Sequence, residues 1–83
     1  MSAEGKEQFH ISSFVVRCLP ERLQDIMATV ASMPGAEVHG DDARGKFVAL
    51  LELESDAALV ETITAIELLQ GVVNTSMVYH HAE

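Results

Sequence analysis

Residues 46–54 read KFVALLELE, and this stretch decides the fold class. Its apolar and β-branched residues predict a strand, and side chains alternate between the two faces of a strand. Val48 and Leu50 therefore share one face. The opposite face is also apolar, carrying Phe47, Ala49, Leu51 and Leu53. A strand that is apolar on both faces is typical of a sheet covered on both sides.

The stretch 9–17, FHISSFVVR, has the same two-faced character. Phe14 and Val16 alternate with Ile11 and Val15, so we expect a second strand that is apolar on both faces. A chain of 83 residues has room for only two helices beside its strands. Two helices can cover one face of a sheet, so we expect the other face to be covered by a partner.

Two amphipathic helices are predicted between the strands. The first begins near Pro20, a residue that suits the first turn of a helix, and it ends at Pro34-Gly35. The second begins after Ser55-Asp56, which supply a cap and a negative charge, and it ends at Gly71. Each has one apolar stripe at helical spacing: Leu23, Ile26, Met27, Val30 and Met33 in the first, and Leu59, Ile63, Ile66 and Leu69 in the second.

The chain contains an internal repeat. A polar strand is expected over 36–41, a turn over 42–45 and a last strand over 72–80. Gly35 and Gly71 lie 36 positions apart, and the apolar helix positions coincide at the same offset. Two strand-helix-strand halves with right-handed crossovers predict an α+β, ferredoxin-like βαββαβ sandwich. We expect a four-stranded antiparallel sheet in the order 4-1-3-2, with both helices on one face. Residues 9–83 would form this single domain, and residues 1–8 a flexible leader.

The repeat also predicts which residues share a face. At the 36-residue offset Phe14 coincides with Leu50 and Val15 with Leu51. The two strands should therefore share one face assignment. The set Val15, Ala49, Leu51 and Leu53 has the longer uninterrupted apolar series, so we expect the helices to cover it. The open face is then expected to carry Ser12, Phe14, Val16, Val48, Leu50 and Glu52. In the last strand the expected inward set is Thr75, Met77 and Tyr79, and the outward set is Asn74, Ser76, Val78 and His80. A bulge after Gly71 would invert that strand.

The charge balance narrows the class of partner. Thirteen acidic and five basic residues give a net charge of -8, which argues against nucleic acid, whose binding depends on attraction to phosphate. A basic partner would suit the chain better. No N-terminal stretch has the layout of a secretory signal, and no apolar run approaches the roughly 20 residues that span a bilayer. We expect a cytoplasmic protein.

No catalytic or metal-binding constellation is recognisable. Ser12 and Ser13 have no nearby base or glycine-rich elbow. His10, His80 and His81 would come close together, but neighbouring residues of a strand face opposite sides and no further ligands accompany them. Cys18 is the only cysteine and has no CxxC partner. We therefore expect no enzyme activity, no metal and no cofactor.

Carboxylates gather near the expected hairpin. Glu52 would lie on the open face beside Leu50, where a carboxylate bordering apolar surface can hold a guanidinium by two hydrogen bonds. Glu37, Asp41 and Glu54 would form an acidic rim around it. The alternative interpretation of this rim is a solvated sheet edge that discourages pairing with other chains.

An ordered set of motifs now resembles the NapD family: SSFVV at 12–16, MPGAEVH at 33–39, GKFV at 45–48 and GVVNTSMVYH at 71–80. The resemblance covers nearly the whole chain after the leader. It implies a cytoplasmic chaperone that binds the twin-arginine signal peptide of the periplasmic nitrate reductase catalytic subunit and restrains export until the cofactor is loaded. The residues then expected to bind the peptide are Ser12, Phe14, Val16, Val48, Leu50, Glu52, Ser76 and Val78.

Other functions of the same fold fit the residues less well. A copper-trafficking domain needs paired cysteines, and an RNA-recognition module needs basic surroundings and several aromatic residues on its sheet. An acylphosphatase-like enzyme needs a phosphate-cradling loop, which Leu19-Pro20-Glu21-Arg22 does not provide. The remaining alternative is a small-molecule-sensing or dimerising regulatory domain. The signal-peptide interpretation expects a monomer.

Overall fold

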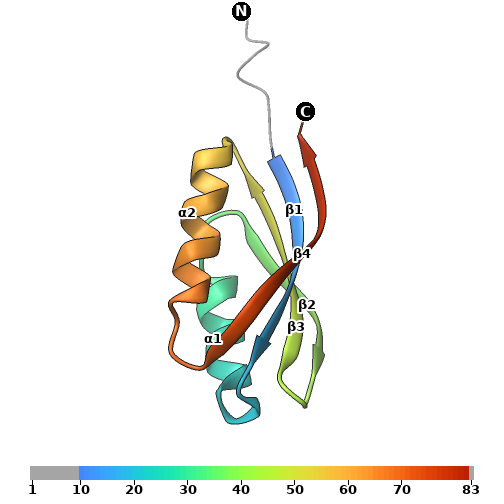
Figure 1. Ribbon diagram of the computed structural model, residues 1–83, viewed down its shortest axis with the longest axis vertical. Helices are drawn as coiled ribbons and strands as arrows, with labels where there is room; N and C mark the ends of the chain where they lie inside the picture. Colours follow the sequence, from blue (N-terminus) through green and yellow to red (C-terminus); the bar gives the residue numbers. More distant parts are fainter. Residues whose placement is uncertain (1–9, 83) are drawn as a thin grey trace, which may run out of the picture.

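The computed structural model describes residues 10–82, with side chains described over 10–79. Strand β1 spans His10–Cys18 and is followed by the 3-10 helix η2, Pro20–Arg22, and helix α1, Leu23–Ala31. Strands β2, Ala36–Asp42, and β3, Lys46–Leu53, form a hairpin. Helix α2, Asp56–Glu67, then leads to β4, Val72–Ala82 (Figure 1). The flexible leader predicted for residues 1–8 lies outside the described residues.

The sheet has the predicted topology. Its four strands lie in the order β2-β3-β1-β4, and the three neighbouring pairs are all antiparallel. Both helices pack on the same side of the sheet (Figure 1). The fold class predicted from the sequence is therefore confirmed, and no described helix covers the opposite face of the sheet, hereafter the open face.

Local sequence signals fix the ends of the helices. Pro20 occupies the first position of η2, where its fixed φ is tolerated and its missing N–H costs nothing. The Ser55 hydroxyl accepts a 3.0 Å hydrogen bond from the backbone N–H of Ala58 and so caps α2. Gly35 and Gly71 follow the two helices with φ of 76° and 101°, a backbone conformation that favours glycine.

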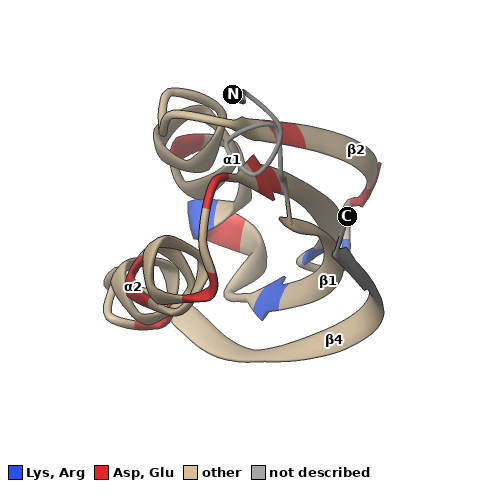
Figure 2. Ribbon diagram, turned by 90° about the horizontal axis from the view of Figure 1, so that it is seen from above, with Lys and Arg blue, Asp and Glu red and all other residues tan. Residues whose placement is uncertain are grey.

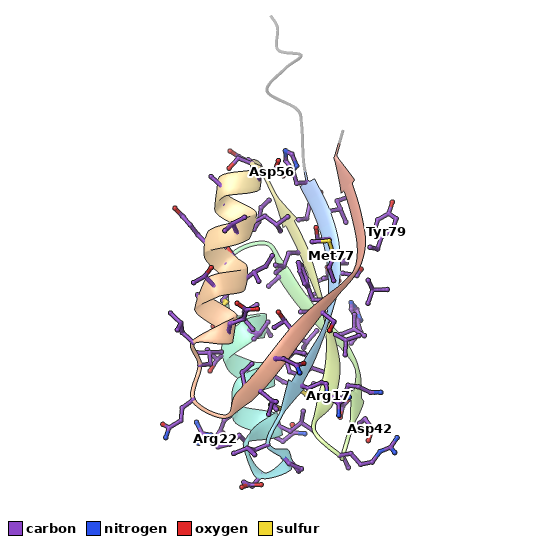
Figure 3. All side chains as sticks on the ribbon, in the orientation of Figure 1. Arg17, Arg22, Asp42, Asp56, Met77 and Tyr79 are labelled. Atoms are coloured by element: carbon purple, nitrogen blue, oxygen red, sulfur yellow. The ribbon has the colours of Figure 1, made fainter. Side chains whose placement is uncertain are left out.

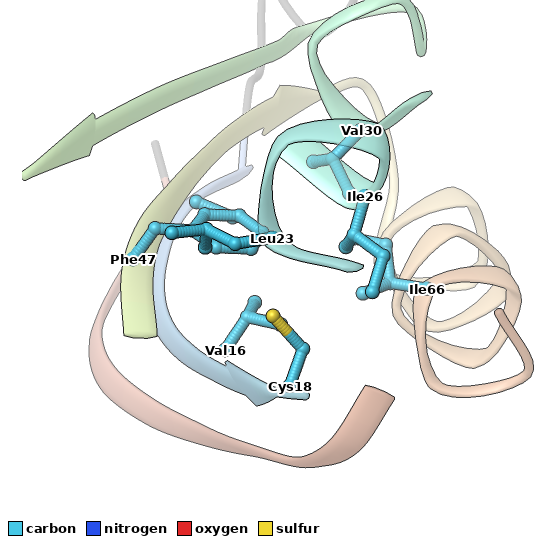
Figure 4. Close-up of a cluster of buried hydrophobic side chains, with 8 residues drawn as sticks. Val16, Cys18, Leu23, Ile26, Val30, Phe47 and Ile66 are labelled. Carbon is cyan, nitrogen blue, oxygen red and sulfur yellow. The ribbon is translucent and has the colours of Figure 1, made fainter. Parts of the chain in front are cut away.

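The core lies between the sheet and the helices (Figure 4). Val16 and Cys18 reach from β1, and Phe47 from β3, toward Ile26 of α1 and Ile66 of α2. A second cluster joins Phe14, Leu51 and Leu59 nearer the other end of the sheet. The apolar stripes predicted for both helices therefore face the core, with Met27, Met33, Ile63 and Leu69 packed around it.

The face assignment predicted for β1 is wrong. Ser12, Phe14 and Val16 are buried against the helices, whereas Val15 lies on the open face. In an antiparallel pair, residues directly opposite one another share a face. Phe14 lies opposite Ala49, which is in the core, and Val15 lies opposite Val48. The assignment predicted for β3 is correct, because Phe47, Ala49 and Leu51 are buried under the helices.

The error has a physical cause in the lengths of the two strand-to-helix connections. Five positions separate Cys18, the last core residue of β1, from Leu23 of α1. Six positions separate Leu53, the corresponding residue of β3, from Leu59 of α2. The helices therefore repeat at 36 residues and the strands at 35, and a difference of one residue exchanges the two faces of a strand.

Strand β4 changes its alternation at a bulge. Thr75 and Met77 lie opposite Val16 and Phe14, on the helix side as predicted. The register then shifts, Val78 becomes the extra residue, and Tyr79 lies opposite Ser13 of the open face. Tyr79 points away from the helices and Met77 toward them (Figure 3). The prediction that Tyr79 faces inward is wrong, and that for His80 falls on a side chain outside the described residues.

Candidate functional site

The open face is the candidate functional site because no described helix covers it and its central side chains are mostly apolar. Three strands of the sheet contribute its central side chains, and the edge strand β2 completes one side. Its members are Ile11, Ser13, Val15 and Arg17 of β1, Lys46, Val48, Leu50 and Glu52 of β3, Glu37 and His39 of β2, and Asn74, Ser76 and Tyr79 of β4.

The centre of the open face is apolar. Val15 lies opposite Val48, and Ser13 lies opposite Leu50. These side chains and Ile11 are half-buried by their neighbours, without any described element above them. Tyr79 extends this surface onto β4 and is 52% exposed. An apolar centre of this kind favours a partner that can exclude water from it.

One end of the open face is acidic. Glu52 lies opposite Ile11, and Glu37 lies opposite Leu50 one strand away. Diagonal neighbours of this kind are about 7–8 Å apart, so the two carboxylates can act on one bound group. The Glu37 Oε1 atom is 3.0 Å from His39 Nε2, a contact on the exposed edge of the sheet. The acidic end therefore offers two carboxylates to a cationic ligand.

The other end is basic. A cavity of about 140 Å³ is lined by Arg17, Asp42, Arg44, Gly45 and Lys46. Arg44 binds Asp42 through two side-chain hydrogen bonds of 3.2 and 2.9 Å. The guanidinium and backbone N–H of Arg44 lower the pKa of Asp42 to about 2. Hence the one carboxylate of this cavity is already paired.

The predicted acidic rim is divided by the fold. Glu37 lies near Glu52, as expected, whereas Asp41 is at the far end of β2 beside the hairpin turn. Glu54 is exposed just after β3. Figure 2 shows acidic ribbon near the start of β2 and basic ribbon at the arrowhead of β1. The open face therefore has two electrically different ends.

Four of the residues predicted to bind a peptide lie where the prediction needs them. Val48, Leu50 and Glu52 belong to the open face, and Ser76 lies opposite Val15. Val78 is 65% exposed at the bulge. The core position of Ser12, Phe14 and Val16 removes these three from the candidate site, which makes their prediction as surface residues wrong.

Sequence reasoning missed Ile11, Ser13, Val15 and Tyr79 on the open face, and Arg17 and Lys46 at its basic end. The alternation within each strand contained the signal for β1, but only the pairing register decides which half of the alternation faces the helices. Arg17 shares a face with Val15 and was the available clue. Placing this face against the helices would have buried the arginine at a high cost in free energy.

Groups with other possible chemistry lie elsewhere. Cys18 is a free thiol in the core, and burial raises its pKa. His10 Nδ1 is 2.9 Å from Asp56 Oδ1, between β1 and the start of α2. Within the described residues, no group of three or more His, Cys, Asp or Glu side chains could hold a metal ion. The side chains of His80 and His81 are outside the described set.

Comparison with known proteins identifies the family. The family model described as NapD protein matches residues 9–83. The chain belongs to the NapD family. It is 34% identical over 76 residues to Chaperone NapD of Escherichia coli K12, covering 90% of this chain and 87% of that protein. Chaperone NapD of Haemophilus influenzae is 26% identical over 81 residues, covering 96% and 87% respectively.

A solved structure of the family has the same fold. The solution structure of the E. coli Tat proofreading chaperone NapD matches with a TM-score of 0.81 at 34% identity, covering 90% of this chain and 80% of that one. These relatives are named as chaperones. None of the helices in the described part of the chain is long and apolar enough to cross a membrane.

Proposed function

We propose that the open face binds the twin-arginine signal peptide of a periplasmic nitrate reductase catalytic subunit. Binding in the cytoplasm would keep the peptide from the export machinery until the enzyme has received its cofactor. The observation that carries this proposal is the combination of an uncovered apolar sheet face with paired carboxylates, Glu37 and Glu52, at one end. The family's named chaperones support it.

The chemistry of an export signal matches this surface. Such signals have a positively charged segment followed by an apolar segment of about 7–15 residues. The arginines would approach Glu37 and Glu52, and the apolar segment would cover Val15, Val48 and Leu50. Arginine is suited to the first task because its planar guanidinium can bind a carboxylate by two hydrogen bonds. The net charge of -8 would also attract a basic peptide over a distance.

A helical peptide would supply the layer that the sheet lacks. From Lys46 to Glu52 the strand rises about 20 Å, and a helix covers that length with about 13 residues. Covering about 500 Å² of apolar surface would contribute on the order of 12 kcal/mol before the costs of association and ordering. Once those costs are subtracted, the remaining free energy is consistent with binding in the micromolar to nanomolar range.

The proposed mechanism is steric sequestration. While the peptide lies on the open face, its arginines and apolar segment are both covered, so the translocase has nothing to engage. The chaperone itself needs no metal, cofactor or catalytic group for this task, and it would act as a monomer. The alternative, a dimerising sensor domain, is not favoured because the relatives are named chaperones.

Isothermal titration calorimetry with a synthetic twin-arginine signal peptide tests the proposal. We expect saturable binding with a dissociation constant of about 10 μM or tighter. A matched peptide with both arginines replaced by glutamine should bind at least about tenfold more weakly, because it leaves the carboxylates without a cationic partner. No heat of binding at high micromolar concentration, in a folded sample, would reject the proposed function. Sedimentation of the free protein tests the monomer.

A further inference from the structure

The basic end of the open face contains an unusual arrangement of charge. Arg17 of β1 and Lys46 of β3 lie directly opposite one another in the antiparallel pair, and both side chains are exposed. Like charges in this position destabilise a sheet. The chain has only five basic residues in all, so their concentration here is not a consequence of composition. A bound negative group would relieve the repulsion.

The neighbouring carboxylate, Asp42, interacts with Lys46 but balances only part of this positive charge. Asp42 lies opposite Lys46 on the neighbouring strand β2, but both of its carboxylate oxygens accept hydrogen bonds from the Arg44 guanidinium. Across the described residues, neither Arg17 nor Lys46 is in ion-pair contact with a carboxylate. The cavity is lined by three cations, Arg17, Arg44 and Lys46, and by one carboxylate, Asp42, so it retains an excess of positive charge.

The two ends of the open face therefore favour one direction of a bound helix. The last turn of a helix exposes carbonyl groups without partners and carries roughly half a negative charge, while the first turn carries the opposite charge. The acidic end, Glu37 and Glu52, favours a helix N-terminus and the arginines near it. The basic end, Arg17 and Lys46, favours the C-terminus. The two ends therefore favour the same direction of a bound helix.

We infer that the signal peptide binds as a helix in one direction, with its arginines at Glu37 and Glu52 and its C-terminal turn on the cationic cavity of Arg17 and Lys46. This inference rests on the proposed function and adds to it a second binding subsite and an orientation. The distance of about 20 Å between the ends matches a helix of about 13 residues, so one peptide helix can reach both. The opposite direction would place the peptide's arginines against Arg17 and Lys46, where like charges repel.

Paramagnetic labelling of the peptide tests the direction. One peptide carries a nitroxide at its N-terminus and a second carries it at its C-terminus, and each is added to the ¹⁵N-labelled protein. We expect the N-terminal label to broaden the amide signals of Glu37 and Glu52, and the C-terminal label those of Arg17 and Lys46. Equal broadening at both ends by both labels overturns the inference while leaving peptide binding to the open face intact. The reverse pattern overturns the inference and also the placement of the peptide's arginines at Glu37 and Glu52, although the peptide would still lie on the open face. Loss of all binding rejects the proposed function itself.

A charge-matched pair of variants gives a second test. Arg17→Gln removes one positive charge at the cavity, and Gln24→Glu adds one negative charge on the exposed helix side. Both lower the net charge by one, so long-range attraction of a basic peptide rises equally. We expect Gln24→Glu to bind unchanged or slightly tighter, and Arg17→Gln to bind about two- to fivefold more weakly. Tighter binding by Arg17→Gln would mean that the peptide's arginines lie at this end and would overturn the inference.

Discussion

Val15 of β1 lies directly opposite Val48 of β3, and this pair forms the apolar centre of the open face. The two side chains come from the central strands of the sheet, so a ligand covering them must lie across its middle. Both are half-buried by their neighbours already. A charge introduced here would be desolvated by any apolar ligand, whereas in the free protein it could still reach water.

Val48→Asp should therefore weaken binding of the signal peptide by about tenfold or more while the domain stays folded. The matched control is Val60→Asp on α2, where the valine is 60% exposed on the helix layer. That change adds the same charge away from the open face and should leave affinity within about twofold of wild type. Calorimetry gives the affinities and circular dichroism the folded state. Equal affinities for the two variants would show that the peptide does not use the open face.

Phe14→Ala is expected to destabilise the protein by about 3–5 kcal/mol, because it removes a buried ring from its contacts with Leu51 and Leu59. The neighbouring change Ser13→Ala, on the open face, should alter the free energy of unfolding by no more than about 0.5 kcal/mol. Urea denaturation followed by far-ultraviolet circular dichroism measures both. A stable Phe14→Ala variant that has lost only peptide binding would restore the opposite face assignment for β1.

The sequence was sufficient for the fold because each local signal agreed with it. Pro20, the Ser55 cap and the glycines after both helices set the ends of elements, and the repeat gave the topology. The site was only partly predictable. The faces of β3 followed from its own alternation, but the faces of β1 depended on its register with β3, which the repeat misplaced by one residue. The bulge at Val78 is likewise a property of pairing rather than of local sequence.

Two glycines with positive φ should respond differently to alanine. Gly35, with φ of 76°, has no room for a Cβ, which would overlap the carbonyl oxygen of Glu52. Gly40 has φ of 59° and open space around it. Gly40→Ala should cost about 1–2 kcal/mol, the ordinary cost of a left-handed backbone, and Gly35→Ala clearly more. Thermal and urea unfolding compare the pair. Equal losses would mean that the chain after α1 can move away from β3.

The Cys18 thiol should react slowly in the folded protein. It is 5% exposed in the main core, and burial raises its pKa, so both access and the thiolate fraction are reduced. Alkylation by iodoacetamide, followed by mass spectrometry, should be at least about tenfold slower than in urea-unfolded protein, since the reaction requires opening of the core. Similar rates in the two states would place Cys18 at an accessible surface.

Asp42 should make stability depend on pH in the acid range. Its pKa falls from 3.8 to about 2 on folding because Arg44 donates hydrogen bonds to the carboxylate. A group whose pKa is lowered on folding stabilises the protein above its unfolded pKa, and this contribution disappears as pH falls from 3.8 to about 2. Asp42→Asn should therefore be less stable than wild type at neutral pH, and the two urea midpoints should converge toward the acid end. Asp41→Asn, which removes the same charge from the adjacent position, controls for net charge. A constant difference between Asp42→Asn and wild type across this range would exclude the ion pair with Arg44 as the cause.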